Sequence, residues 1–283
     1  MEVIRAITMA RKVCDAARSA GRAIGFVPTM GAFHDGHLSL MKRARDERDH
    51  VVVSIFVNPL QFGPGEDLSR YPRDEDRDLS IAGELGLDVV FAPSVQEMYP
   101  AGPPEVTVDP GPLGDRLEGA ARPGHFRGVA TVVAQLFDVV GPSTAYFGEK
   151  DAQQLTVIRR MVRDLSLPIE VVGCPTVREL DGLANSSRNV FLSLQQREAA
   201  GCLFLALSEA AQMARGGERD TATLVAAMAR EIGATPEARI DYAAVVDDET
   251  FEEVSTITGP ARALVAARFA ETRLIDNLLL PAS

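Results

Sequence analysis

The chain has 283 residues, of which 46% are hydrophobic and 24% charged, and its formal net charge at pH 7 is −11. This composition is typical of a globular protein with a substantial core, in one large domain or two. The acidic balance argues against a nucleic-acid partner, because such proteins usually carry a basic face. The sequence has no apolar run of about 18 residues, so we expect no membrane span.

The cysteines and the first residues indicate a cytoplasmic protein. Cys14, Cys174 and Cys202 are scattered, so they neither form a disulfide framework nor have the spacing of zinc ligands. The first five residues lack the basic start and apolar run of a signal peptide. We therefore expect a cytoplasmic location and no membrane partner.

Hydrophobic periodicity predicts alternating helices and strands up to about residue 176. The expected helices are residues 2–20, a segment that begins near residue 38, 74–85, 128–140 and 155–165. The expected strands are residues 23–27, 50–57, 88–92, 105–108, 144–147 and 169–173. Such alternation indicates an α/β fold with a doubly wound, Rossmann-like parallel sheet, whose ligands bind at the carboxyl ends of the strands.

The pattern changes after residue 176. Two helices are expected there, followed by three strands with short connections, which favour an antiparallel sheet. The helices are residues 194–214 and 221–232, and the strands are residues 240–246, 262–269 and 273–279. We therefore predict a Rossmann-like domain over residues 1–176 and a smaller α+β domain over residues 177–283.

The segment after the first predicted strand carries the strongest functional signal. Pro28 and Gly31 are expected to end that strand, and His34 and His37 then flank Gly36 at the start of a helix. Backbone N–H groups and the dipole at a helix N-terminus favour an anion, and histidines add donors near pH 7. Glycine also permits close approach of a ligand. The segment predicts a phosphate site, with a helix cap plus one packed histidine, or a zinc site, as alternatives.

Two loops after later strands also carry polar side chains. Asn58 and Gln61 offer amide donors and acceptors suited to a hydroxyl or carboxylate, although a simple turn with a polar edge stays open. Gly148 permits close approach, and Lys150 supplies a compact, mobile charge suited to a polyphosphate. Only three of the 29 basic residues are lysines, so Lys150 stands out in a chain that otherwise uses arginine.

Three further segments have a functional and a plain interpretation. Asp78 and its neighbouring aspartates could ligate Mg²⁺, or could form a solvated helix face. Arg122 begins a Gly, His and Arg cluster that suits an anion, or is part of a plain loop before a helix. Ser186, Ser187 and Arg188 together could wrap phosphates.

Five blocks, in order over residues 25–192, resemble the pantothenate synthetase family of nucleotidyltransferases, which split ATP between its α and β phosphates. The blocks are residues 28–37, 58–62, 122–128, 148–154 and 181–189. The resemblance implies ATP-dependent condensation of pantoate with β-alanine through pantoyl adenylate, with release of AMP and pyrophosphate. It also implies Mg²⁺ and a homodimer.

The resemblance also assigns roles to individual residues. Catalysis is implied for His34, His37, Lys150 and Arg188, substrate binding for Gln61, Gln154, Asn58 and Arg122, and metal binding for Asp78. ATP binding is implied for Met30, Gly31, His34, Gly36, His37, Gly148, Glu149, Lys150, Asp151, Val177, Asn185, Ser186, Ser187 and Arg188. His37 is the proton donor in the family. On physical grounds we expect it to stabilise charge, because phosphoryl-type transfer demands little covalent chemistry from the protein.

One residue departs from the family pattern. Asn185 stands where the family usually has Met or Leu, in the counterpart of the Lys-Met-Ser-Lys-Ser loop, so it could loosen ATP. Two alternatives stay open. One is a nucleotidyltransferase acting on a phosphorylated alcohol, which would not need Gln61 and Gln154 together. The other is a nucleotide sensor with a decayed site, against which the retained histidines, Lys150 and Arg188 argue.

Overall fold

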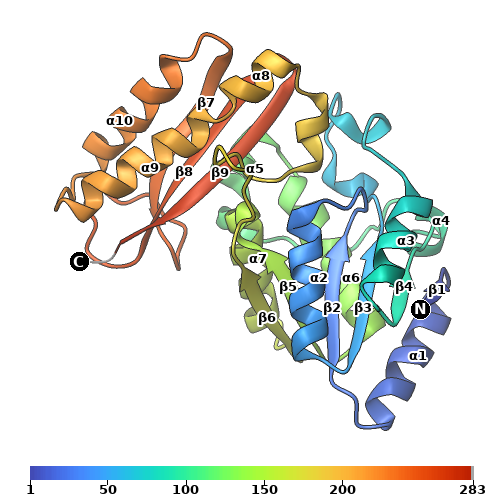
Figure 1. Ribbon diagram of the computed structural model, residues 1–283. Helices are drawn as coiled ribbons and strands as arrows, with labels where there is room; N and C mark the ends of the chain where they lie inside the picture. Colours follow the sequence, from blue (N-terminus) through green and yellow to red (C-terminus); the bar gives the residue numbers. More distant parts are fainter. Residues whose placement is uncertain (282–283) are drawn as a thin grey trace. The chain divides into compact units, whose positions relative to one another are not determined.

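The computed structural model describes residues 1–281 and divides the chain into two compact units (Figure 1). The first unit comprises Met1–Glu149 and Gln153–Pro175. The second comprises Lys150–Ala152 and the chain from Thr176 onward. Residues 150–152, which lie within the predicted first domain, therefore group with the second unit.

The first unit is built on a six-stranded sheet in the order β1-β4-β3-β2-β5-β6. Its strands are β1 (Glu2–Ile4), β2 (Ile24–Thr29), β3 (His50–Ile55), β4 (Val89–Phe91), β5 (Ser143–Gly148) and β6 (Ile169–Cys174). All neighbouring strands pair in parallel. This confirms the predicted doubly wound parallel sheet.

Helices cover both faces of this sheet. They are α1 (Ile7–Ser19), α2 (Asp35–Glu47), α3 (Glu75–Glu84), α4 (Val95–Met98), α5 (Glu118–Ala121), α6 (His125–Val140) and α7 (Ala152–Asp164), with 3₁₀ turns η1 (Pro59–Gln61), η2 (Asp67–Ser69), η3 (Gly111–Asp115) and η4 (Glu149–Asp151). Met41 of α2 and Ala82 of α3 pack with Val27 of β2 in one buried cluster. Phe26, which alternation places on the opposite face, meets Phe137 of α6 with ring centroids 6.3 Å apart.

Three expectations for the first unit were wrong. Pro28 does not end β2, because the strand continues to Thr29 and Pro28 pairs with Ser54 of β3. Residues 2–4 form strand β1 instead of the start of a helix, because their backbone pairs in register with β4. Residues 105–108 form no strand. Val106 in that segment is 87% exposed, so its β-branched side chain is not drawn into the core, and the segment joins no sheet.

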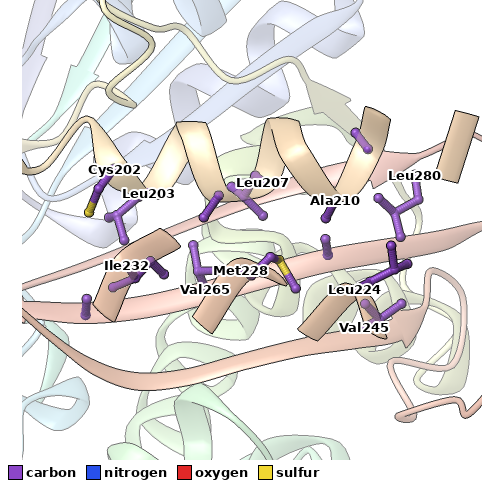
Figure 2. Packing of buried hydrophobic residues seen from close by; sticks show 14 of the residues in the cluster. Cys202, Leu203, Leu207, Ala210, Leu224, Met228, Ile232, Val245, Val265 and Leu280 are labelled. Carbon is purple, nitrogen blue, oxygen red and sulfur yellow. The ribbon is translucent and has the colours of Figure 1, made fainter. Parts of the chain in front are cut away.

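The second unit contains an antiparallel sheet in the order β7-β8-β9. Its elements are η5 (Ser187–Phe191), α8 (Leu194–Ala199), α9 (Cys202–Arg215), α10 (Thr221–Gly233), β7 (Ala238–Asp247), β8 (Ala261–Phe269) and β9 (Thr272–Leu280). Figure 2 shows Leu207 of α9, Met228 of α10 and Val265 of β8 within the buried cluster between helices and sheet. The predicted α+β architecture is confirmed.

The helix predicted over residues 194–214 is interrupted. It forms α8 and α9, separated at Ala200 and Gly201. Ser193 and Gln196 form a capping box that starts α8, and Gly201, which is a poor helix former, precedes α9. None of the described helices is both long and apolar enough to cross a bilayer.

Candidate active site

The predicted phosphate residues of the first unit lie where the strand order reverses. From β2 the chain builds the sheet through β3 and β4 on one side, and later through β5 and β6 on the other. Open α/β sheets bind ligands outside the carboxyl ends of strands at such a switch point. The loop with His34 and His37 follows β2, and Gly148 ends β5. The sheet therefore brings these two segments to one edge.

The two histidines sit at the start of α2. His34 is its N-cap, and its Nδ1 accepts a hydrogen bond from the Gly36 amide at 3.2 Å. A neutral ring that accepts at Nδ1 carries its proton on Nε2. The rings of His34 and His37 lie with centroids 4.1 Å apart. Two imidazoles thus stand together at the positive end of a helix dipole, an arrangement that favours an anion.

The loop before these histidines is held by Asp78 of α3. Gly31 and Ala32 both have positive φ, +81° and +53°. The Asp78 carboxylate, only 1% exposed, accepts from the amides of Ala32 at 2.7 Å and Phe33 at 2.8 Å. Burial raises the pKa of Asp78, although the two amides oppose the rise. A Cβ on Gly31 would lie 2.9 Å from the carboxylate, so the position needs glycine.

This geometry gives Asp78 a loop-holding task in place of an open coordination site. Both of its oxygens already accept a backbone N–H, so the carboxylate is engaged in holding the loop. Within residues 1–281, no group of three or more His, Cys, Asp or Glu side chains could hold a metal ion. Mg²⁺ commonly keeps waters and binds through substrate phosphates, so a protein cage is not required for it. The metal role of Asp78 stays a prediction without support from this arrangement.

Asn58 is the hub of the turn after β3. Its Nδ2 donates to Gln61 Oε1 at 3.2 Å and to the Gly128 carbonyl at 3.1 Å. Its Oδ1 accepts from the Leu60 amide at 3.2 Å and from the Tyr99 hydroxyl at 2.8 Å. All four hydrogen-bonding positions of the amide are thus used within the protein. A direct substrate contact would require one of these bonds to break, so the structure favours Asn58 as a support for Gln61.

Gln61 is further anchored through its backbone. The Gln61 carbonyl accepts from His125 Nδ1 at 2.8 Å, and Arg122 Nη1 lies 3.0 Å from the other ring nitrogen of His125. Burial, with a smaller contribution from the Arg122 charge, lowers the pKa of His125 to about 4, so its ring is neutral near pH 7. Arg122 also forms a two-pronged ion pair with Glu66, with bonds of 2.9 and 2.7 Å.

The sequence did not predict this cluster of Glu66, Arg122 and His125. Arg122 was expected to contact substrate, and the structure shows that it first neutralises Glu66 and orients His125. Glu66 had no signal in the sequence, because it lies in a loop 56 residues from its partner. His125 lies in the block of residues 122–128, but the sequence predicted no separate role for it.

Neighbouring glutamines at the start of α7 differ in their surroundings. Gln153 is 3% exposed, donates to the carbonyls of Leu113 and Arg116 at 2.9 Å each, and accepts from the Glu118 amide at 3.1 Å. It therefore ties α7 to the η3–α5 segment. Gln154, the predicted pantoate contact, is half-buried beside it, and its role stays a prediction.

The second unit gathers most of the other residues expected to bind ATP. The Asn185 amide donates to the Val177 carbonyl at 3.0 Å, so both residues lie at the base of one hairpin. Ser186 follows as the N-cap of η5 and accepts from the Arg188 amide at 3.3 Å. Asn185 itself is half-buried. Lys150 and Asp151 group with this unit, whereas Gly148 and Glu149 belong to the first.

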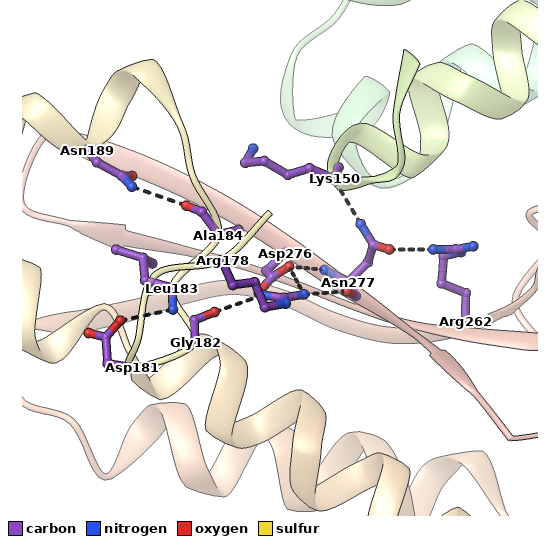
Figure 3. A network of polar contacts seen from close by, with 10 residues as sticks. All are labelled: Lys150, Arg178, Asp181, Gly182, Leu183, Ala184, Asn189, Arg262, Asp276 and Asn277. Atoms are coloured by element: carbon purple, nitrogen blue, oxygen red, sulfur yellow. Dashed lines mark hydrogen bonds and ion pairs between the residues drawn. The ribbon is translucent and has the colours of Figure 1, made fainter. Parts of the chain in front are cut away.

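A buried polar network underlies this hairpin and was not anticipated. Figure 3 shows Arg178 of the hairpin bound to Asp276, and Lys150 bound through its carbonyl to Asn277. The signal was present in the sequence, since Asp276 and Asn277 are consecutive polar residues inside the apolar strand β9. Their role becomes clear only from their hydrogen-bond partners, Arg178 and Lys150.

Comparison with known proteins places this geometry in a family. The sequence model of the family described as Pantoate-beta-alanine ligase matches residues 2–279. A pantothenate synthetase from Roseiflexus castenholzii is 57% identical over 268 residues, covering 94% of this chain and 96% of that one. One from Moorella thermoacetica is 52% identical over 280 residues, covering 99% of each chain.

Solved structures agree with these relatives. The crystal structure of a pantothenate synthetase from Thermus thermophilus has a TM-score of 0.93 and 52% identity, covering 99% of this chain and 100% of that one. A pantoate-beta-alanine ligase from Francisella tularensis, complexed with beta-gamma ATP and beta-alanine, has a TM-score of 0.81 and 34% identity, covering 99% and 97%. This chain therefore belongs to the pantoate–β-alanine ligase family, as the resemblance of its motifs implied.

Proposed function

We propose that this chain ligates pantoate to β-alanine with ATP, through a pantoyl-adenylate intermediate, and releases AMP and pyrophosphate. The observation that carries the proposal is the meeting of the His34–His37 loop and Gly148 at the sheet edge where strand order reverses. Family membership over residues 2–279 supports it, as does the Francisella ligase solved with beta-gamma ATP and beta-alanine.

In the first step, a carboxylate oxygen of pantoate attacks the α-phosphorus of ATP. The bond from that phosphorus to the bridging oxygen breaks, and pyrophosphate leaves with the electron pair. The protein must align two anions and stabilise the charge that moves to the leaving group. We assign this work to His34 and His37, whose rings lie together at the N-terminus of α2.

In the second step, the amine of β-alanine attacks the acyl carbon, and AMP leaves with the electron pair of the acyl–oxygen bond. The amine loses its proton to solvent or to AMP. An activated acyl group needs no strong base, in keeping with the neutral amides of Gln61 and Gln154 that we assign to pantoate. Asn58 and the His125 bond to the Gln61 carbonyl support the first of these amides.

The remaining assignments concern ATP and its metal. Lys150, Ser186, Ser187 and Arg188 are assigned to the outer phosphates, where guanidinium and ammonium groups form charge-assisted bonds. Mg²⁺ would accompany the nucleotide and help neutralise its phosphates. The homodimer and the cytoplasmic location implied by the resemblance belong to this proposal as well.

Isotope exchange tests the proposal directly. Given pantoate, Mg²⁺ and ATP without β-alanine, the enzyme should exchange labelled pyrophosphate into ATP, because adenylation precedes amide formation. Omission of pantoate should abolish the exchange. His34→Ala and His37→Ala should each reduce its rate by about ten- to a hundredfold, as expected for the loss of a charge-assisted bond of about 1.5–3 kcal/mol.

Two results would contradict the proposal. Exchange that requires β-alanine would show that the reaction is concerted or differently ordered. Exchange that ignores pantoate but responds to a phosphorylated alcohol would place the chain with other nucleotidyltransferases. Formation of AMP with pantoate and β-alanine, measured in parallel, separates an active enzyme from a nucleotide sensor.

A further inference from the structure

Two consecutive polar residues are buried in the middle of β9. Asp276 and Asn277 are each 3% exposed, although Leu274 and Leu280 of the same strand belong to the apolar core. Because side chains alternate along a strand, Asp276 shares the core-facing side with Leu274, and Asn277 points to the other face. Burial of such groups is costly unless each finds partners, so their partners indicate why they are there.

The side chain of Asn277 connects two segments that are distant in sequence (Figure 3). Its Oδ1 accepts from Arg262 Nη1 at 2.6 Å, and its Nδ2 donates to the Lys150 carbonyl at 2.8 Å. Arginine can only donate, and a carbonyl can only accept, so the two partners agree on one orientation of the amide. Asn277 therefore holds the backbone of Lys150 in a defined place.

The backbone of Asn277 is held just as firmly. Its N–H donates to Asp276 Oδ1 at 2.8 Å, and its carbonyl accepts from Arg178 Nη2 at 3.2 Å. Arg178 binds both oxygens of Asp276, at 2.6 and 3.0 Å, and donates to the Gly182 carbonyl at 3.0 Å. β9 is an outer strand of its sheet, so Arg178 caps an edge that no strand covers in the described part of the chain.

We propose that Asn277 is a positioning residue for ATP. Its side chain holds Lys150, and its carbonyl holds Arg178 and hence the hairpin that leads to Ser186 and Arg188. Two phosphate-binding segments are thereby fixed to one point of β9, which lowers the entropy lost when both engage one nucleotide. The proposal rests on the proposed function in naming ATP as the ligand and in assigning its phosphates to Lys150, Ser186 and Arg188.

The test removes the bond to Lys150 with little change of shape. Asn277→Asp keeps an acceptor for Arg262 but cannot donate to the Lys150 carbonyl. We expect ATP to bind about five- to twentyfold more weakly in equilibrium dialysis, because a held ammonium becomes mobile. In turnover, KM for ATP should rise and KM for pantoate should not.

A matched control separates positioning from general stability. Asp248 accepts from Arg262 Nε, one partner further from Lys150. Asp248→Asn should lower the unfolding midpoint to a similar degree and leave ATP affinity within twofold of wild type. If Asn277→Asp does not fold, Asn277→Ala loses the same bond without adding charge and takes its place. Equal loss of ATP affinity in the Asp248 variant would overturn the proposal.

A double-mutant cycle provides the second test. In a Lys150→Ala background the ammonium is already absent, so Asn277→Asp should weaken ATP binding less than twofold further. Additive effects of the two substitutions would show that Asn277 does not act through Lys150. Wild-type affinity of Asn277→Asp for ATP would also overturn the proposal. These outcomes concern nucleotide binding alone, whereas failure of pantoate-dependent exchange by the wild-type enzyme would count against the proposed reaction.

Discussion

Acid should destabilise the protein through His125. Its ring lies buried between the Gln61 carbonyl and Arg122, so protonation would put a second cation beside a guanidinium and remove the acceptor at Nε2. Its pKa in the folded protein is about 4, against 6.5 when unperturbed. The unfolded chain therefore binds a proton first, and stability falls as pH drops from about 7 toward 4. Between pH 7 and pH 5 the expected loss is about 2 kcal/mol.

Two measurements check this prediction. The chain has four histidines, so single replacements can assign each ring resonance, and an NMR titration should place His125 near pH 4. Urea unfolding at pH 7 and pH 5 should show the loss in wild type and a smaller loss in His125→Asn. His50→Asn is measured in parallel, because burial lowers the pKa of His50 as well and its share of the pH dependence must be separated from that of His125. A titration of His125 near 6.5, or the same pH dependence in His125→Asn, would refute the reasoning.

Two substitutions in the first unit test other contacts. Gly128→Ala should destabilise the protein by about 1–3 kcal/mol and raise KM for pantoate, because a Cβ there would lie 2.4 Å from the Leu60 carbonyl oxygen. Gly83→Ala in helix α3, where the nearest atom would be 3.9 Å away, should be neutral or stabilising in the same urea titration. Asp78→Leu should cost about 2–4 kcal/mol, because two loop amides lose their acceptor. Pyrophosphate exchange should fall with it, whereas full exchange in folded Asp78→Leu would show that the loop needs no such support.

The sequence indicated the fold because its local patterns are strong. An apolar run marked β2, although the strand continues past Pro28, and the spacing of Leu38, Met41 and Ala44 marked α2. These patterns depend on neighbours a few residues apart, so they can be recognised without a structure. They failed where long-range pairing decided the outcome. Ile4 continues the helical apolar spacing of Ile7 and Ala10, yet β4 offered the backbone of residues 2–4 a strand partner.

In the candidate site, too, contiguous motifs could be predicted and contacts between distant residues could not. The motif around His34 and His37 predicted an anion site by itself, since the glycine, the histidines and the helix start are contiguous. The loop-holding contacts of Asp78 could not be predicted, because the amides that donate to it belong to residues 45 and 46 positions away. Asn58 likewise meets the Tyr99 hydroxyl 41 residues away and the Gly128 carbonyl 70 residues away.

The hydrogen bond that holds the backbone of Lys150 could not be predicted from the sequence. The unusual lysine itself was evident from composition, but its carbonyl meets Asn277, 127 residues along the chain. Short-range patterns indicated most of the helices and strands, and motifs predicted which of these carry chemistry. Which buried amide or carboxylate holds each loop depends on how distant segments pack. Such hydrogen-bond partners are brought together by the fold, so no regular spacing in the sequence reveals them.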